Sequence, residues 1–403
     1  MNIKQTNLYN LLRRIRRLWR IRPYFPSHFT LLIKDLYLIR NGVKNIRNIV
    51  NNNAEHLKAV FEWLCLAQDI NHDGGVAGLY RLDTGWTASY PETTGYIIPT
   101  FFNYYRYTGN DKYKDRAIAM SDWVVSIQMN NGAFQGELID VLPKPEVFNT
   151  GQVLGGLIRA YEETKNNKYI DSAIRAGDWL VNIQNDDGAW RQYTYGDLPR
   201  TYHSRIAWFL LELYKYTKDN KYLQSSLRQL NWSLSHQQDN GFFDNCAFDD
   251  VSPPFIHTIS YAVEGFLESG IILNQSKYIN AARRVANVLL NIFEENGFLA
   301  GHYNNGWTSN AQYTCLTGNA QISFVWLRFY EITKEIRYLN AAIKMNNHLK
   351  SLQDLNNNNK GIKGGIKGSH PIWGNYMSYR YTNWAAKFFA DTLMLEDKIK
   401  QNL

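Results

Sequence analysis

The chain has few cysteines and no hydrophobic run long enough to cross a membrane. Cys65, Cys246 and Cys315 are odd in number and scattered over 403 residues, which excludes a disulfide framework and offers no zinc-binding spacing. The most apolar stretch near the start, FTLLIKDLYLI, is interrupted by Lys34 and Asp35. It is shorter than the ~20 residues that a membrane-spanning helix needs, and no signal-peptide cleavage pattern follows it. We therefore expect a cytoplasmic protein without a metal or a cofactor.

Acidic side chains are almost absent from residues 1–48, where eleven Lys or Arg side chains face one acid, Asp35. This arm carries +10 of a total net charge of +8, so the rest of the chain is close to neutral, at −2. A nucleic-acid-binding fold is therefore not expected. Within the arm, residues 8–22 place leucines and Trp19 on one helical stripe with arginines around it. This pattern favours peripheral contact with an anionic membrane on its inner face, and the alternative is a helix packed on the rest of the protein.

The sequence does contain an internal repeat of 53 to 60 residues. Each copy has an amphipathic helical segment, such as residues 113–127, preceded by a segment that is apolar on all sides. The aligned anchors of the six copies are Trp63, Trp123, Trp179, Trp232, Val288 and His348. Six inner and six outer helices predict an all-α (α/α)6 barrel, or toroid, over residues 49–403. An open solenoid is disfavoured, because its end repeats need polar faces and the last inner segment stays apolar.

Six long segments are predicted to carry the functional site, because each joins an outer helix to the next inner one while the opposite turns are tight. All six emerge on one face, over the amino ends of the inner helices. Those ends present free N–H groups and suit anionic or hydroxyl-rich ligands. The segments are roughly 69–93, 129–149, 185–202, 238–256, 294–317 and 354–382.

Aromatic, amide and cationic side chains gather on this loop face. Aromatic rings beside polar side chains suit sugars, which have apolar faces and hydroxyl edges. As an alternative, some of the rings plug the toroid, and the amides cap or pack the inner helices. The candidate substrate-binding residues are Trp86, Tyr90, Asn149, Gln152, Trp190, Arg205, His257, Tyr261, Gln321, Lys367, Trp373 and Arg380.

Two carboxylates are the candidate catalytic pair of a glycoside hydrolase. Glu92, in SYPETTGY, stands at the start of the first inner helix, where it would act as general acid or base or simply cap the helix. Asp250, in FDDVSPP, would complete the pair, although such a residue is also a common turn former. Glu137, Asp140 and Glu146 are weaker candidates in a similar loop.

A second chemistry is suggested at the start of the third inner helix. His203 or Tyr202 would move a proton from C5 of a uronosyl ring while Arg205 neutralises its carboxylate. His203 would stay neutral at a helix amino end and act as a base near neutral pH. As alternatives, the histidine bonds to a loop and Arg205 pairs with an acid.

The hairpin number and the loop-borne site resemble the six-hairpin glycosidase-like enzymes, which include unsaturated glucuronyl hydrolases, toroidal polysaccharide lyases and, more loosely, D-glucuronyl C5-epimerases. The blocks SYPETTGY, VFNTGQVLGGL, PPFIHTISY, CLTGNAQ and GGIKGSHPIWG are similar to an uncharacterised bacterial family associated with surface-polysaccharide production. The resemblance implies the fold over residues 54–398. It carries over no catalytic residue, because the HGRGNGW-like segment of the hydrolases and the RWDYHT-like segment of the epimerases are absent.

The leading hypothesis is a carbohydrate-active enzyme that cleaves or modifies an acidic cell-surface polysaccharide or lipid-linked oligosaccharide. Hydrolysis through Glu92 is preferred to lyase or C5-epimerase chemistry. A non-catalytic glycan-binding or scaffold subunit is one alternative. A terpenoid cyclase-like toroid is another, because residues 184–190 resemble the structural Q-W motif of triterpene cyclases, but the D-x-D-D acid of those enzymes is absent.

Overall fold

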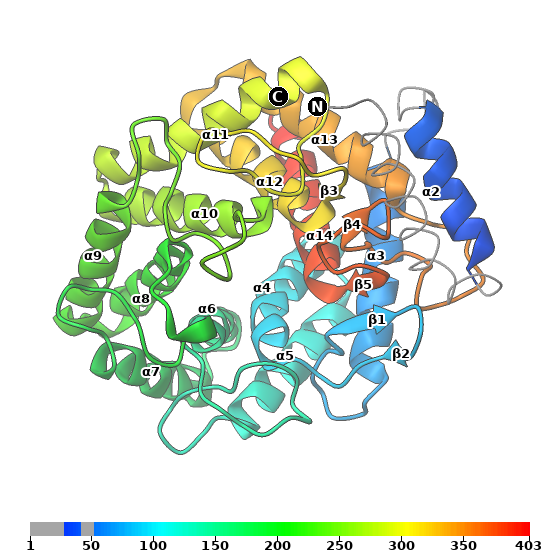
Figure 1. The fold of residues 1–403 in the computed structure, drawn as a ribbon. Helices are drawn as coiled ribbons and strands as arrows, with labels where there is room; N and C mark the ends of the chain where they lie inside the picture. The colour runs from blue at the N-terminus through cyan, green and yellow to red at the C-terminus, as the bar shows by residue number, and fades with distance from the viewer. Residues whose placement is uncertain (1–27, 42–51) are drawn as a thin grey trace.

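The computed structural model describes residues 28–41 and 52–403, and its main body is a ring of helical hairpins (Figure 1). The inner helices are α4 (Pro91–Thr108), α6 (Val147–Thr164), α8 (Ser204–Thr217), α10 (Ile256–Leu273), α12 (Leu316–Thr333) and α14 (Asn383–Lys400). The outer helices are α3 (Asn53–Asp69), α5 (Asp111–Ser126), α7 (Asn167–Asn182), α9 (Asn220–Ser235), α11 (Ser276–Asn296) and α13 (Ile336–Leu352). The predicted (α/α)6 toroid is confirmed.

The ring is closed by its two ends. Each inner helix packs on the next, and α14 packs on α12, on α4 and on the first outer helix, α3. At this seam, Asn53 donates to Asp397 at 2.7 Å and accepts from the Lys350 ammonium at 2.8 Å. The sixth hairpin therefore consists of α14 and α3, from opposite ends of the described chain, and an open solenoid is excluded.

Each inner helix from α4 to α12 turns into its outer helix through two residues. The first adopts a left-handed conformation, as Gly109 does with φ 69°, and this ends the inner helix. At three of the turns the second is a polar N-cap: the side chains of Asn110, Asn166 and Asp219 accept a backbone N–H of the outer helix. These short turns force the long connections onto the opposite face.

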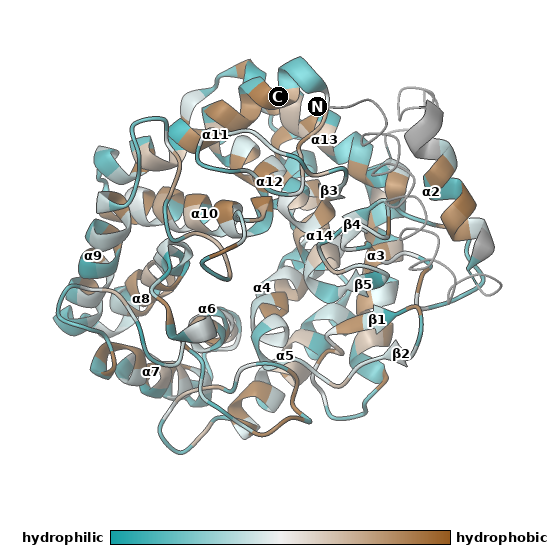
Figure 2. Ribbon diagram, viewed as in Figure 1, coloured by the Kyte–Doolittle hydropathy of each residue, from teal (hydrophilic) through white to brown (hydrophobic). Residues whose placement is uncertain are grey.

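Glycines let the inner helices approach closely. A Cβ on Gly156 of α6 would lie 2.1 Å from the carbonyl oxygen of Gly95 on α4, and a Cβ on Gly155 would lie 2.5 Å from the Phe209 ring. The absence of side chains at this glycine pair therefore allows α6 to pack closely on α4 and α8. Figure 2 shows the outer helices with alternating hydrophilic and hydrophobic residues, as helices with one solvated face require.

A recurring glutamine links three of the outer helices, α5, α7 and α9, to the next one. Gln184 donates to the carbonyls of Gly188 and Ser225, and Gln128 and Gln237 make the same two bonds in their own repeats. The segment that resembles the Q-W motif is thus a structural tie between neighbouring hairpins.

The described part of the arm is helix α2 (Phe29–Asn41), which packs on the outside of the ring (Figure 1). Its Asp35 is buried and holds the 367–372 segment: it pairs with the Lys367 ammonium and accepts the backbone N–H of Ile372 at 2.7 Å. Residues 8–22, with their predicted membrane contact, lie outside the described residues. Among residues 28–41 and 52–403 no helix is long and apolar enough to span a bilayer.

Short strands brace the long segments. Strand β1 (Leu79–Arg81) lies between β2 (Gly85–Trp86) and β5 (Arg380–Thr382), and β3 (Thr314–Cys315) pairs with β4 (Ser369–His370). All pairings are antiparallel. Through β1 and β5 the first long segment is joined to the last, so the loop face is closed at the same seam as the helices.

Candidate active site

Glu92 lies in the first turn of α4, in the interior of the ring. Pro91 is the first residue of the helix, which fixes Glu92 at the second position, and the Glu92 residue is only 9% exposed. Burial raises the pKa of its carboxyl to about 8, and the charge of Glu146 acts in the same direction. A hydrogen bond with Tyr90 and the charge of Arg205 oppose this shift. Glu92 is therefore mostly protonated at neutral pH.

A second glutamate, Glu146, lies at the N-cap of the neighbouring inner helix α6. Its carboxylate is packed against Gly136, where an added Cβ would meet Oε2 at 2.2 Å. Burial raises its pKa to about 7, with a further contribution from Glu137. Because the Glu146 charge also raises the pKa of Glu92, the two carboxyls titrate as neighbours.

Tyrosine side chains surround Glu92. Tyr90 precedes α4 and is half-buried, whereas the others lie inside the ring and are at most 3% exposed. Burial raises the pKa of each phenol, and the charge of Glu92 adds to the shift for all but Tyr376, which interacts with Tyr261 and Tyr96 instead. These phenols are neutral donors at any physiological pH. The cluster consists of Tyr90, Tyr96, Tyr202, Tyr261 and Tyr376.

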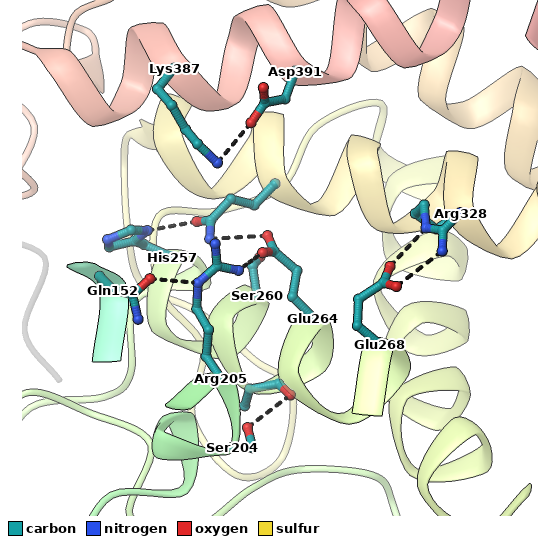
Figure 3. Close-up of polar contacts among 12 residues, drawn as sticks. Gln152, Ser204, Arg205, His257, Ser260, Glu264, Glu268, Arg328, Lys387 and Asp391 are labelled. Atoms are coloured by element: carbon teal, nitrogen blue, oxygen red, sulfur yellow. Dashed lines mark hydrogen bonds and ion pairs between the residues drawn. The ribbon is translucent and has the colours of Figure 1, made fainter. Parts of the chain in front are cut away.

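A buried polar chain, drawn in Figure 3, contacts this cluster where the Arg205 guanidinium packs on the Tyr261 ring. The Arg205 guanidinium pairs with Glu264 of α10, and its Nε donates to Oε1 of Gln152 at 2.9 Å. Gln321 of α12 donates to Glu264 at 3.2 Å and also contacts His257 Nδ1, with 2.6 Å between Oε1 and Nδ1. The Arg205 side chain is further enclosed by the rings of Tyr261 and Phe388.

The two predicted histidines are both enclosed. His203 ends a 3-10 turn (Thr201–His203) before α8, and both of its ring nitrogens are buried without a hydrogen-bond partner among the described residues. His257 packs on Tyr261, with 4.3 Å between ring centroids. Burial lowers the pKa of each imidazole to about 3. Both imidazoles are therefore neutral near pH 7, and the expectation that His203 acts as a base titrating in that range does not fit this environment.

Asp250 does not join Glu92. Its side chain is 61% exposed and pairs with Arg200 at 3.1 Å, at the outer end of the fourth long segment. Asp249 beside it caps a turn by accepting the N–H groups of Val251 and Ser252. The turn-forming alternative describes these aspartates, and Glu146, not Asp250, is a carboxyl whose charge acts on Glu92.

The predicted binding residues separate into two sets. Tyr90, Gln152, Arg205, His257, Tyr261 and Gln321 lie in the cluster or in the polar chain that contacts it, and Asn149 joins them through Tyr90. Trp190 is a fully buried plug that donates to the Leu180 carbonyl, and Trp86 packs on Trp63. Trp373 packs on the core.

Arg205 and Lys367, two of the cations predicted to bind substrate, are not free to pair with a substrate carboxylate. Arg205 is neutralised by Glu264 and Lys367 by Asp35, and all four side chains are at most 5% exposed. Arg380 lies on β5, where it contacts the Met377 sulfur at 3.7 Å. The placement of Arg205 follows its stated alternative, pairing with an acid.

Sequence reasoning missed the middle of two inner helices. Glu264 stands nine residues into α10, and Lys387 and Asp391 form an ion pair on α14 at 2.7 Å (Figure 3). A charge in an apolar helix is the one signal that marks such residues, because a buried charge requires a partner. Within the described residues no three His, Cys, Asp or Glu side chains gather as metal ligands.

Comparison with protein families adds a match over part of the chain. Residues 129–293 match the family model described as the catalytic domain of GH127 β-L-arabinofuranosidases. The matched part contains Glu146, Arg205, His257 and Glu264 and ends before Gln321, while Glu92 precedes it. No curated protein matches the chain.

Solved structures share the fold over most of the chain at low identity. A heparin-specific unsaturated glucuronyl hydrolase has a TM-score of 0.68 at 14% identity, covering 87% of this chain and 98% of its own. A cellobiose 2-epimerase from Bacillus thermoamylovorans has a TM-score of 0.67 at 15% identity, covering 88% and 100%. A sugar epimerase from a ruminal bacterium has a TM-score of 0.70 at 13% identity, covering 87% and 98%. The chain has the six-hairpin glycosidase-like toroid, and the family match supports a carbohydrate-active enzyme.

Proposed function

We propose that this chain is a glycoside hydrolase in which Glu92 and Glu146 are the catalytic pair. The observation that carries the proposal is a pair of interacting carboxyls, buried Glu92 and half-buried Glu146, each at the start of an inner helix, whose pKa values are raised to about 8 and about 7. Glycoside hydrolysis uses one protonated and one ionised carboxyl on either side of the glycosidic bond. The partial match to a glycoside hydrolase catalytic domain supports the same class.

The different surroundings of Glu92 and Glu146 indicate which carboxyl is the acid and which is the base. Glu92 has the higher pKa, so it keeps its proton and donates it to the leaving oxygen of the glycosidic bond. Glu146 loses its proton first and acts as the base or nucleophile. The surrounding phenols, among them Tyr90 and Tyr202, donate hydrogen bonds to sugar oxygens and exclude bulk water.

The test is a set of oligosaccharides, both neutral and uronic-acid-containing, incubated with the purified chain in D2O and analysed by mass spectrometry. New chain ends are expected in at least one reaction. Glu92→Gln and Glu146→Gln should each reduce the cleavage rate by on the order of 10²–10⁴-fold, the usual contribution of an acid or base. Asp250→Asn is the matched control and should keep the wild-type rate, because this carboxylate is exposed and paired with Arg200.

Other outcomes would identify another reaction. Deuterium uptake without cleavage would show an epimerase, the activity named for two of the structures with this fold. Cleavage with new absorbance near the unsaturated-uronate band would show a lyase. Binding without turnover, unchanged by Glu92→Gln, would show a glycan-binding subunit, and each of these results would overturn the hydrolase assignment.

We keep as proposals a cytoplasmic location and peripheral membrane contact through residues 8–22, which support action on a lipid-linked oligosaccharide. Their basis is the density of arginine around an apolar stripe. The full chain should sediment with vesicles that contain anionic lipid and be released by high salt, whereas a variant lacking residues 1–27 should not sediment. Sedimentation of both proteins, or of neither, would contradict the membrane role.

A further inference from the structure

The buried polar chain that contacts the tyrosine cluster has a fixed direction of hydrogen bonding. Arg205 has donors only, and Glu264, ionised opposite the guanidinium, has acceptors only. The Gln321 atom that faces Glu264 at 3.2 Å must therefore be the donor, Nε2. The opposite amide orientation would place two acceptors against each other in a buried site. The carbonyl oxygen of Gln321 consequently faces His257.

This orientation determines where the imidazole proton lies. Gln321 Oε1 is 2.6 Å from His257 Nδ1 and can only accept, so Nδ1 carries the hydrogen. His257 is a buried neutral imidazole, because burial and the nearby Arg205 charge both lower its pKa. A neutral imidazole has one N–H group, and Nε2 is therefore left with a free lone pair.

The His257 ring faces the tyrosine cluster around Glu92. Its ring centroid lies 4.3 Å from that of Tyr261 and 5.4 Å from that of Tyr376. The residue is 4% exposed, and no described residue forms a hydrogen bond with Nε2. An acceptor placed at the site without a partner of its own calls for a donor from a ligand.

We propose that His257 Nε2 accepts a hydrogen bond from a hydroxyl group of a bound sugar, and that Gln321 and Glu264 are positioning residues that hold the imidazole in the Nδ1–H form. The inference rests on the proposed function and adds a substrate contact to it. Sugar hydroxyls are the groups of a glycan that can donate a hydrogen to an unprotonated ring nitrogen.

The tautomer can be measured without any substrate. In the full chain labelled with ¹⁵N-histidine, long-range ¹H–¹⁵N spectra distinguish protonated from unprotonated ring nitrogens, and loss of one signal set in His257→Gln assigns this residue. We expect Nδ1 to be protonated and Nε2 unprotonated from pH 5 to 8. An Nε2–H form, or an averaged signal, would overturn the assignment directly in the wild-type chain.

The same helix offers a matched control for the positioning role (Figure 3). Glu268 lies one turn after Glu264 on α10 and pairs with Arg328 at 2.7 Å, away from His257. Glu264→Gln removes the charge that orients Gln321, so its His257 signals should shift toward a mixture of the two tautomers. Glu268→Gln should leave them unchanged. Equal shifts in both variants, or in neither, would contradict the relay.

The ligand is tested in Glu92→Gln protein, which should bind sugars without consuming them. An arabinan oligosaccharide or an oligogalacturonide that binds this protein should shift the Nε2 resonance, and His257→Phe should weaken its binding on the order of tenfold, the loss of about one hydrogen bond. Binding or cleavage of either glycan without a shift of Nε2 would overturn this inference alone. Absence of all sugar binding would overturn this inference together with the proposed function.

Discussion

At the scale of single residues, Glu92 and Glu146 define a narrow working range of pH. The acid must be protonated, so the rate should fall as pH rises through the apparent value near 8. The base must be ionised, so the rate should fall as pH drops through the value near 7. The pH profile of kcat/KM on the substrate identified by product analysis should be a bell with its maximum between these values. A plateau extending well below pH 6 would contradict the pairing.

The buried Glu92 should also lower the free energy of unfolding at the pH where the enzyme is active. Its pKa is raised on folding from 4.5 to about 8, so the folded chain holds a proton that the unfolded chain releases between these values. Stability contributed by the protonated form is complete below pH 4.5 and is lost as pH rises through 8. Glu92→Gln should therefore be more stable than the wild type at pH 8, by on the order of a few kcal/mol. Urea midpoints should converge at pH 4.5; a constant difference would contradict this account.

The candidate site was only partly predictable, because sequence patterns identify residues that are close along the chain and not contacts between distant residues. Glu92 could be found because a proline and a glutamate opened a predicted helix, a local pattern. Glu264 could not be identified as the partner of Arg205, because 59 residues and a hairpin separate them. The ion pair between Arg205 and Glu264 is a tertiary contact, and a sequence pattern does not reveal it. The same holds for the interaction between Glu92 and Glu146, which favours Glu146 over Asp250 as the second carboxyl.

At the scale of elements, helix α2 is held by one buried charge cluster. Although burial alone would raise it, the ammonium of Lys367 and the ring of His370 hold the pKa of Asp35 well below its usual range. Asp35→Asn should destabilise the chain by about 3–5 kcal/mol, because Lys367 would remain buried and unpaired. Lys34 lies on the same helix as Asp35 and forms a more exposed ion pair with Asp354 of the last long segment. Lys34→Gln should therefore cost less than about 1 kcal/mol. Equal urea midpoints for the two variants would contradict the buried cluster.

The contact between α4 and α6 depends on the absence of a side chain. Gly156→Ala would press a methyl group on the Gly95 carbonyl and should destabilise the ring by about 1–3 kcal/mol, which thermal unfolding would measure. Gly306→Ala, in a loop with no atom closer than 3.6 Å to the added Cβ, is the control and should be nearly neutral. Glycine is unfavourable inside a helix, so the Gly155-Gly156 pair in α6 is explained by the close approach of the neighbouring helices.

At the scale of the whole molecule, the repeat was predictable because the sequences of the hairpins share one pattern of residues. Closure of the ring was inferred from the apolar last helix, which an open array would have left uncovered. The docking of α2 was not predicted, because both alternatives for the arm concerned residues 8–22.

Removal of α14 tests the closure. A chain ending at residue 382 would expose the apolar faces of α3 and α12, so it should lose cooperative unfolding and bind a hydrophobic dye. A chain ending at residue 400 lacks only three exposed residues and should unfold as the wild type does. A stable and cooperative chain without α14 would show that the seam is dispensable.

The seam has a consequence for synthesis of the protein on the ribosome. The first outer helix, α3, cannot form its hairpin until α14 has been translated, more than 300 residues later. Trp384 and Phe388 of α14 also contact Tyr376 and Tyr261, so the tyrosine cluster lacks these neighbours until the final helix leaves the exit tunnel. During that interval the apolar inner helices have no ring to enclose them, and nascent chains of this protein should depend on chaperones that bind before translation ends.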